Sequence, residues 1–193
     1  MTCKVLIVVM SCYKHKHLWK EILNRGLNNL IIICGKKMHD DYSYENKILY
    51  LNCNDAYEGL PEKMIFAINA ILRIDEFKTY THIMKVDDHD NKFNSSLNQR
   101  LINESNINLK DPFGTYIHDY LGQRLHTYIL RNWHINKCSP SSHWNTQPYM
   151  GPNTNYLDGG SSYILTRRAM EFIQNEYNFN NIEIVQKNHI WED

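Results

Sequence analysis

The sequence predicts an α/β protein in which helices flank a mostly parallel central sheet. Two continuous apolar runs, 5–10 and 30–34, are rich in β-branched residues, which is typical of strands buried on both faces. Helix patterns alternate with the strand patterns in the first half of the chain. This alternation favours parallel strands joined by right-handed crossovers.

The elements of the first half follow in order. After the strand over 5–10, apolar residues recur at helical spacing up to Gly26, a residue type that commonly ends a helix. A second strand is expected over 30–34. A polar stretch over 36–46 separates it from a third strand, expected over 47–52.

The clearest helix pattern begins at Gly59. Pro61 and Glu62 suit the first turn of a helix, and apolar side chains then recur at helical spacing as far as Leu72. A fourth strand is expected over 80–86. It leads directly into a group of acidic residues.

The second half has a looser pattern. No internal repeat or linker divides the chain, so we expect one domain over 1–193. The expected elements are a helix over 96–102, strands over 115–120 and 125–133, a loop over 139–155, a strand over 161–165 and a helix N-capped by Thr166.

The charge balance excludes a general polyanion binder. Lys and Arg total 21, and Asp and Glu total 21, so the chain lacks the positive surplus that displaces counterions from nucleic acid. The apolar run over 5–10 is far too short to span a bilayer. Five widely spaced cysteines without a C-x-x-C pair indicate free thiols in a reducing compartment. We therefore expect a cytoplasmic protein, in the host cytoplasm if the chain is viral, with neither a nucleic-acid partner nor a membrane span.

Polar segments follow three of the expected strands. They are Ser11–Tyr13, Gly35–Lys37 and Asp87–Asp90. In open parallel sheets, ligands bind beyond the carboxyl ends of the strands, where these segments would meet. The sequence therefore places a polar loop, two lysines and an acidic cluster at one edge of the sheet.

The acidic cluster itself indicates a metal site. Asp87, Asp88 and Asp90 repel one another unless a cation lies among them. Hard oxygen ligands suit Mg²⁺ or Mn²⁺, which keep open positions for substrate phosphates. A solvated turn is the alternative, since Asp is a common turn residue. Asp88 and Asp90 have the D-x-D spacing, and His89 is an alternative ligand.

Four motifs then occur in order along the chain. They are Tyr57–Met64, Lys85–Asp90, Tyr156–Thr166 and Trp191–Asp193. As an ordered set they resemble glycosyltransferase family 31, the β-1,3-galactosyltransferase and Fringe-like group. That family has a Tyr-x-x-Leu-x-x-Lys helix start, Lys-Val-Asp-Asp-Asp, Gly-Gly-x-Gly-Tyr-x-x-Ser and Glu-Asp-Val. The first strand with its polar loop, and the segment from Trp133 to Tyr149, resemble small viral members such as the chlorella-virus glycosyltransferase domain.

The resemblance implies a single-domain GT-A (Rossmann-like) fold with a nucleotide-binding half over 1–92 and an acceptor-side half over 93–193. It also implies a metal-dependent inverting glycosyltransferase. Such an enzyme moves a hexose or related sugar from a nucleotide-sugar donor, most often a UDP-sugar, to a hydroxyl of a glycan or glycoprotein acceptor. The implied cofactor is Mn²⁺ or Mg²⁺.

The resemblance further implies roles for individual residues. The residues implied on the donor side are Ser11, Cys12, Tyr13, Lys63 and Asp87, with Asp87 near the ribose. The implied metal ligands are Asp88 and Asp90. The residues implied on the sugar and acceptor side are Asp158, Gly159 and Gly160. The implied general base is Asp193.

The chain also departs from the family pattern. His89 stands where the family often has Asp, which leaves the metal ligands within 87–90 open. The family's membrane anchor and lumenal cysteines are absent, so a secretory-pathway location is not carried over. The family continues past the acid that corresponds to Asp193, which leaves open whether this chain is a domain cut from a longer protein.

Aromatic residues are frequent in the segment 133–156. Trp144 and Tyr149 are of the type that stacks on sugar faces, which would place Trp144 on the acceptor side; packing within the loop is the alternative. Trp133 is expected in the core. Without the resemblance, Lys63 is expected to be a surface lysine.

Two other functions fit the same residues. A metal-dependent nucleotidyltransferase or phosphohydrolase would use the same acidic cluster on an α/β sheet. A non-catalytic nucleotide-sugar or glycan-binding module would use the same edge without chemistry. The products formed from a UDP-sugar distinguish all three.

Overall fold

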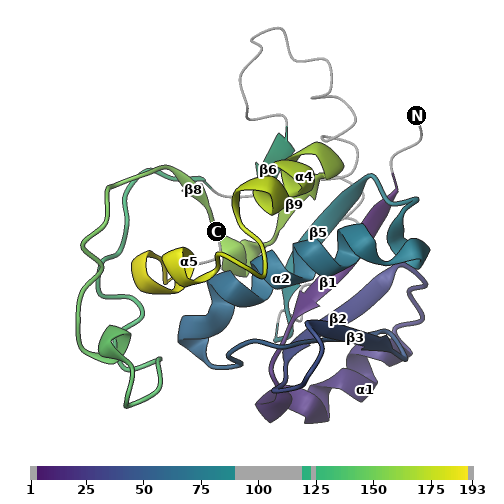
Figure 1. The fold of residues 1–193 in the computed structure, drawn as a ribbon, viewed down its shortest axis with the longest axis horizontal. Helices are drawn as coiled ribbons and strands as arrows, with labels where there is room; N and C mark the ends of the chain where they lie inside the picture. Colours follow the sequence, from purple (N-terminus) through teal and green to yellow (C-terminus); the bar gives the residue numbers. More distant parts are fainter. Residues whose placement is uncertain (1–3, 90–118, 123–124, 191–193) are drawn as a thin grey trace, which may run out of the picture.

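The computed structural model describes residues 4–89, 119–122 and 125–190, and in this part of the chain one seven-stranded sheet forms the centre of the fold (Figure 1). The strand order is β3-β4-β2-β1-β5-β9-β6. The strands are β1 (Val5–Met10), β2 (Leu30–Gly35), β3 (Tyr42–Glu45), β4 (Ile48–Leu51), β5 (His82–Asp87), β6 (Tyr120–Gly122) and β9 (Tyr163–Thr166). β4, β2, β1 and β5 are parallel, whereas β3 and β9 run antiparallel to their neighbours. The expected α/β class with a parallel centre is confirmed, and the sheet is antiparallel at both edges.

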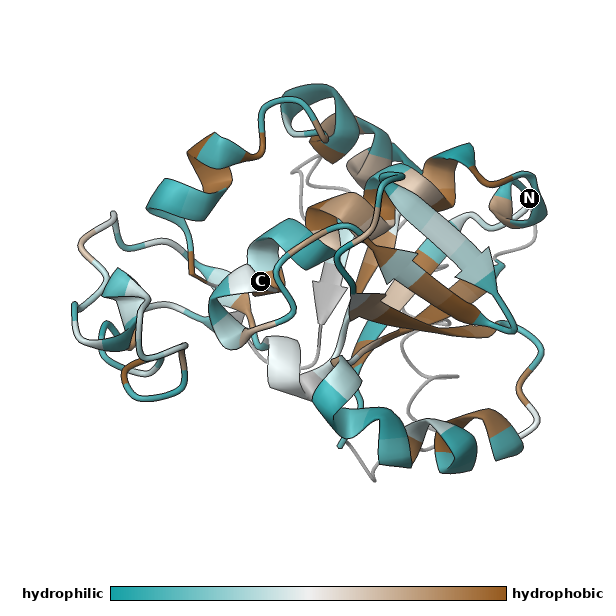
Figure 2. Ribbon diagram, turned by 60° about the horizontal axis from the view of Figure 1, so that its bottom comes forward, coloured by the Kyte–Doolittle hydropathy of each residue, from teal (hydrophilic) through white to brown (hydrophobic). Residues whose placement is uncertain are grey.

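Apolar side chains cover both faces of the central strands (Figure 2). Successive side chains of a strand point to opposite faces, and β1 is buried along its whole length. Its odd-numbered residues pack with Trp19 and Ile22 of α1 (Lys16–Asn24), and its even-numbered residues pack on the other side of the sheet. The helices on that side are α2 (Leu60–Arg73), α4 (Arg167–Glu176) and α5 (Glu183–Asn188). Each fully buried aliphatic side chain contributes about 1.5–3 kcal/mol.

Two helix starts agree with the sequence prediction. α2 begins at Leu60 with Pro61 in its first turn. α4 begins directly after Thr166, whose hydroxyl oxygen accepts a hydrogen bond from the backbone N–H of Ala169 at 3.2 Å. A cap of this kind typically contributes about 1 kcal/mol.

The polar stretch over 36–46 contains a strand that the sequence pattern did not predict. β3 pairs antiparallel with β4 across a two-residue turn at Asn46 and Lys47. Both turn residues have positive φ, 51° and 64°, as a type I′ hairpin turn requires. β3 is an edge strand without a buried side chain, so it carries no apolar run. The polar stretch thus supplies an edge strand that forms a hairpin with β4.

The prediction of a strand over 125–133 is mostly wrong. Only β7 (Leu125–His126) pairs, and its partner is β8 (Tyr156–Leu157). Bends and turns follow β7, and the loop over 139–155 holds one short 3₁₀ turn. β9 begins at Tyr163, later than predicted, because another 3₁₀ turn precedes it.

Other expectations concern segments outside the described residues. The helix predicted over 96–102 and residues 115–118 of the next predicted strand lie there, and β6 begins at Tyr120. α5 is a short helix that the sequence pattern did not predict. In the described ranges, no helix combines the length and apolar character needed to cross a bilayer.

Gly59 precedes α2, and a Cβ atom there would lie 2.1 Å from the backbone oxygen of Asn54. We expect Gly59→Ala to lower the free energy of unfolding by about 1–3 kcal/mol, because the backbone must shift to relieve this overlap. Urea denaturation followed by circular dichroism measures the loss. Gly26→Asn is the control, since nothing lies within 4 Å of a Cβ at Gly26 and asparagine tolerates its positive φ. Equal losses in the two variants would contradict the steric argument.

Candidate functional site

The carboxyl ends of the four parallel strands meet at one edge of the sheet, as the sequence predicts. The loops that follow β1, β2, β4 and β5 are in contact there. Tyr13 after β1 and Gly35 at the end of β2 both donate backbone hydrogen bonds to Asp55, which follows β4. Ser11 after β1 contacts Asp88 after β5. The loops at the carboxyl ends of the parallel strands thus form a connected polar layer.

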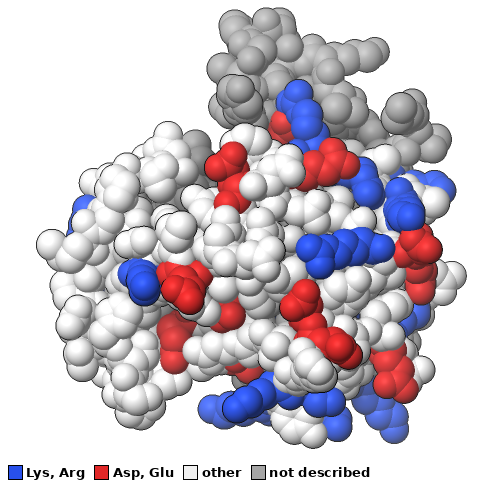
Figure 3. All heavy atoms as spheres, in the orientation of Figure 1, with Lys and Arg blue, Asp and Glu red and all other residues white. Residues whose placement is uncertain are grey.

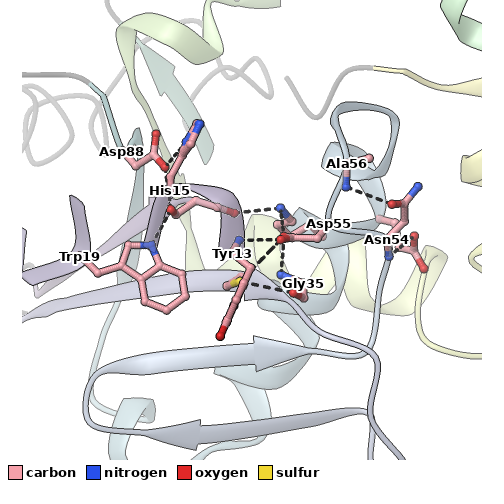
Figure 4. Close-up of polar contacts among 12 residues, drawn as sticks. Tyr13, His15, Trp19, Gly35, Asn54, Asp55, Ala56 and Asp88 are labelled. Atoms are coloured by element: carbon pink, nitrogen blue, oxygen red, sulfur yellow. Dashed lines mark hydrogen bonds and ion pairs between the residues drawn. The ribbon is translucent and has the colours of Figure 1, made fainter. Parts of the chain in front are cut away.

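Asp55 joins three of these elements (Figure 4). Its Oδ2 accepts the Tyr13 backbone N–H at 2.6 Å, and its Oδ1 accepts the Gly35 N–H at 2.7 Å. The ammonium of Lys63 on α2 lies 2.7 Å from the same Oδ1 and donates to the Ser11 backbone oxygen at 2.8 Å. Lys63 is only 1% exposed, so the expectation of a surface lysine is wrong. Its charge ties α2 to the ends of β1 and β4.

Asp88 belongs to a second buried network, on the α1 side of the sheet (Figure 4). Its Oδ2 accepts the Ser11 hydroxyl at 2.6 Å and lies 2.8 Å from His15 Nδ1. The Ser11 oxygen in turn accepts the Trp19 indole N–H at 2.8 Å. Only 4% of the Asp88 side chain is exposed. Its carboxylate is directed toward these partners.

Asp87, the last residue of β5, has different partners from Asp88, the turn residue that follows it. Its Oδ1 lies 2.7 Å from the ammonium of Lys85, which also donates to the Gly159 backbone oxygen at 2.9 Å. Lys85 is only 1% exposed although it carries a charge, because it lies in the buried strand β5. This lysine therefore holds the end of β5 against the turn that precedes β9.

A cavity of about 530 Å³ opens beside Asp87. Asp158, Gly159 and Gly160 form the same side of it. A Cβ atom added to Gly160 would lie 3.3 Å from Asp158 Oδ1 and 3.9 Å from Asp87 Oδ2. The missing side chain of Gly160 thus leaves a space bordered by two carboxylates.

Aromatic side chains also line this cavity. Tyr57, Tyr128, Trp133 and Tyr156 line it, and the His126 ring stacks on Tyr156 with centroids 4.9 Å apart. Tyr128 and Trp133 are 58% and 57% exposed. In Figure 3, charged side chains are sparse over the side of the molecule formed by the 127–155 segment. The cavity therefore combines two carboxylates, which lie next to Lys85 and His126, with several aromatic rings.

Which aromatic residues of this segment are buried and which are exposed differs from the expectation. Trp144 is 8% exposed and packs with Tyr149, Cys138 and Ile190 in a small core of its own. The alternative of loop packing therefore fits Trp144, which does not line the cavity. Trp133 was expected in the core, which is wrong: it lines the cavity.

A second cavity, of about 560 Å³, lies between α2 and α4. Its lining is chiefly apolar, with Met64, Ile68 and Phe172 among the residues, and Asp119 at this site is bonded to Arg168. A ligand site needs convergent polar groups as well as volume. The cavity at the strand ends has them, and it is the better candidate.

The thiols near Asp55 are poor nucleophiles. Burial, and then the charge of Asp55, raises the pKa of Cys34 to about 12. Burial also raises the pKa of Cys53 far above its ordinary value. Both remain protonated at neutral pH, whereas the thiolate is the reactive form. Chemistry at this edge therefore falls to carboxylates rather than to these two cysteines.

Apart from Trp144, which is buried in the small core described above, the residues predicted from the sequence fall into three groups. The cavity brings together Asp87, Asp158, Gly159 and Gly160. The polar layer beside it contains Ser11, Cys12, Tyr13, Lys63 and Asp88, none of which lines the cavity. The residues outside the described ranges are Asp90 and Asp193.

Three important residues were not predicted. Asp55 follows the third predicted strand, so the rule that placed the other loops at this edge could have found it. Lys85 is a charged residue inside an otherwise apolar strand pattern, which was also a usable signal. For Trp133 no sequence signal existed, because its exposure depends on how the 127–155 segment folds.

No protein-family model matches the chain, and no curated protein matches it either. Within the described residues, no group of three or more His, Cys, Asp and Glu side chains is arranged to hold a metal ion. A functional conclusion therefore depends on the two carboxylates of the cavity, its aromatic rings and the sequence motifs.

We expect Asp55→Asn to lower the free energy of unfolding by about 3–5 kcal/mol, because it leaves the buried Lys63 ammonium without its counter-charge. Urea denaturation measures the loss. The double variant Asp55→Asn with Lys63→Met should recover part of the stability, since both partners are then neutral.

Asp75→Asn is the matched control for this prediction. Asp75 forms an exposed pair with Lys78, and exposed ion pairs contribute little. Its denaturation midpoint should equal that of the wild type. A midpoint for Asp55→Asn equal to that of Asp75→Asn would show that the Lys63 pair does not hold this edge together.

Proposed function

We propose that this protein is a metal-dependent inverting glycosyltransferase of the GT-A type, which transfers a hexose or related sugar from a UDP-sugar to a hydroxyl group of a glycan. The observation that carries the proposal is the cavity at the carboxyl ends of the parallel strands. Its carboxylates suit the divalent cation that would neutralise the donor's diphosphate, and its aromatic rings suit a sugar ring. The four ordered motifs support the same reading.

The donor set of the cavity fits a hard divalent cation. Asp87 Oδ2 and Asp158 Oδ1 border the space beside Gly160, and Mg²⁺ usually takes one or two carboxylates together with water and substrate phosphates. When bound, Mn²⁺ or Mg²⁺ supplies positive charge that stabilises the leaving diphosphate. In this proposal Asp87 and Asp158 hold the cation. Asp88, directed toward Ser11 and His15, keeps the end of β5 in position.

Lys85 positions Asp87 and the turn that contains Gly159. It holds one oxygen of Asp87 and the backbone oxygen of Gly159, so the strand end and the glycine turn keep a fixed separation. The second oxygen of Asp87 is then directed into the space next to Gly160. Because these groups are already in place, little reorganisation is needed when charge develops on the donor.

The acceptor hydroxyl needs a carboxylate to take its proton as the glycosidic bond forms. Asp193 remains the predicted general base. Asp158 also lies in the cavity, but a carboxylate that holds the cation beside the leaving diphosphate does not lie on the sugar face from which the acceptor attacks. In an inverting reaction the base lies on the face of the sugar opposite the leaving group. In this proposal the acceptor therefore enters next to Tyr128 and Trp133.

Product analysis tests the reaction class. The protein is incubated with a panel of UDP-sugars and Mn²⁺, with and without simple glycosides as acceptors. Release of UDP that accelerates with an acceptor supports glycosyl transfer. Release of UMP and a sugar phosphate would instead indicate a phosphohydrolase or nucleotidyltransferase, and binding without any product would indicate a binding module.

We expect Asp87→Asn and Asp158→Asn each to weaken the binding of UDP in the presence of Mn²⁺ by about tenfold or more, because each removes a carboxylate from the cation. Isothermal titration calorimetry measures the affinity. UDP affinity without metal should change little in Asp158→Asn.

Asp41→Asn is the matched control, since Asp41 is an exposed acid paired with Arg73 and does not line the cavity. Wild-type UDP affinity is expected there. Unchanged affinity in both cavity variants would place the cation elsewhere and contradict the assignment of Asp87 and Asp158.

A further inference from the structure

Trp133 is held at the surface by buried neighbours. His134, the next residue, is fully buried, and its ring packs edge-on against Trp144 with centroids 5.6 Å apart. The His134 Nε2 lies 2.8 Å from the backbone oxygen of Gln147, to which it donates. The chain is therefore fixed at residue 134, and the indole of Trp133 stands out beside the cavity rather than in the loop core.

The same segment is anchored on its other side. Arg131 donates to the backbone oxygens of Tyr149 and Gly151 at 2.7 and 2.9 Å. The backbone N–H of Ser139 donates to Glu58, at the start of the α2 region, at 3.1 Å. These hydrogen bonds fix the loop that carries Trp133, so Trp133 is exposed on a loop with a defined conformation.

Lys137 orients the indole. Its ammonium lies 3.3 Å from the centroid of the Trp133 ring and 5.7 Å from that of Tyr57. In the described part of the chain no carboxylate lies within ion-pair distance of Lys137, so the aromatic rings are its partners. A cation over one face of an indole restrains the ring. Trp133 nevertheless remains 57% exposed, which leaves ring surface open to a ligand.

The cavity also supplies hydrogen-bond acceptors. Asp158 lies there with Asp87, and Tyr128 adds a second exposed ring. A pyranose ring has the complementary chemistry: one face presents C–H groups that pack on an aromatic ring, and its edge presents hydroxyl groups that donate to carboxylates. A simple alkyl chain would use only the aromatic rings.

We propose that Trp133 and Tyr128 form the acceptor subsite, on which the pyranose ring of a glycan acceptor stacks, and that Lys137 positions the indole of Trp133. This inference rests on the proposed function and adds to it the residues that would recognise the acceptor. An acceptor hydroxyl on a sugar ring, rather than on an isolated serine or threonine side chain, follows from it.

The test measures glycoside binding separately from UDP binding. The whole chain is titrated with methyl β-galactopyranoside, methyl β-glucopyranoside and methyl α-mannopyranoside, followed by saturation-transfer NMR. We expect at least one of them to bind with a Kd in the millimolar range. Trp133→Ala should weaken it by about tenfold, and Trp133→Phe, which keeps an aromatic ring, by about threefold or less.

Lys137→Met removes the cation but keeps the length of the side chain. It should weaken the same glycoside by about threefold, because the indole is less restrained. In both Trp133 variants the affinity for UDP with Mn²⁺ should equal that of the wild type; Lys137→Met is excluded from this comparison, because Lys137 lines the same cavity and its charge attracts a diphosphate. Phe172→Ala is the matched control, since Phe172 is 65% exposed and lines the other cavity.

The outcomes separate the subsite from the transferase. Wild-type glycoside affinity in Trp133→Ala, an equal loss in Phe172→Ala, or no binding of the three glycosides to the wild type would overturn the subsite. If glycoside binding depends on Trp133 but UDP does not bind, the subsite is supported and the transferase proposal fails, which leaves a glycan-binding module.

Discussion

Two ammonium groups buried beneath the edge of the sheet determine the shape of the candidate site. An unpaired charge in such a position costs several kcal/mol, so each lysine must find a carboxylate and a further acceptor. Lys63 takes Asp55 and the backbone oxygen of Ser11, and Lys85 takes Asp87 and the backbone oxygen of Gly159. Each pairing joins a strand end to a loop from elsewhere in the chain.

The pairings also divide the aspartates of the edge between structure and ligand binding. Asp55 is surrounded by donors from three elements, and Asp88 is enclosed by the α1 side of the sheet. Asp87 gives one oxygen to Lys85 and presents the other next to Gly160. Clustering in the sequence therefore does not mean clustering in space.

The sequence contained part of the information needed to separate the structural aspartates from Asp87. The apolar runs of β1 and β2 and the stripe of α2 predicted the centre of the fold, because burial on two faces or on one helical face leaves a clear pattern. The apolar run of β5 likewise predicted that this strand ends at the acidic cluster. Which aspartate lines the cavity depends on the different partners of Asp87 and Asp88, which the run does not encode.

Other features depend on contacts that no local pattern encodes. β3 is a polar edge strand defined by its pairing with β4, and β7 and β8 are two-residue strands defined by each other. The division between Trp133 and Trp144 has the same origin. Which indole is buried depends on the packing of Cys138, Tyr149 and Ile190 around one of them, and these three residues come from separate parts of the sequence.

Crystals grown with Mn²⁺ and UDP would test the account most directly, through the anomalous scattering of manganese. We predict one manganese peak between the carboxylates of Asp87 and Asp158, in contact with the diphosphate of UDP. A peak at Asp88 and His15, or a nucleotide bound outside the cavity at the strand ends, would contradict it.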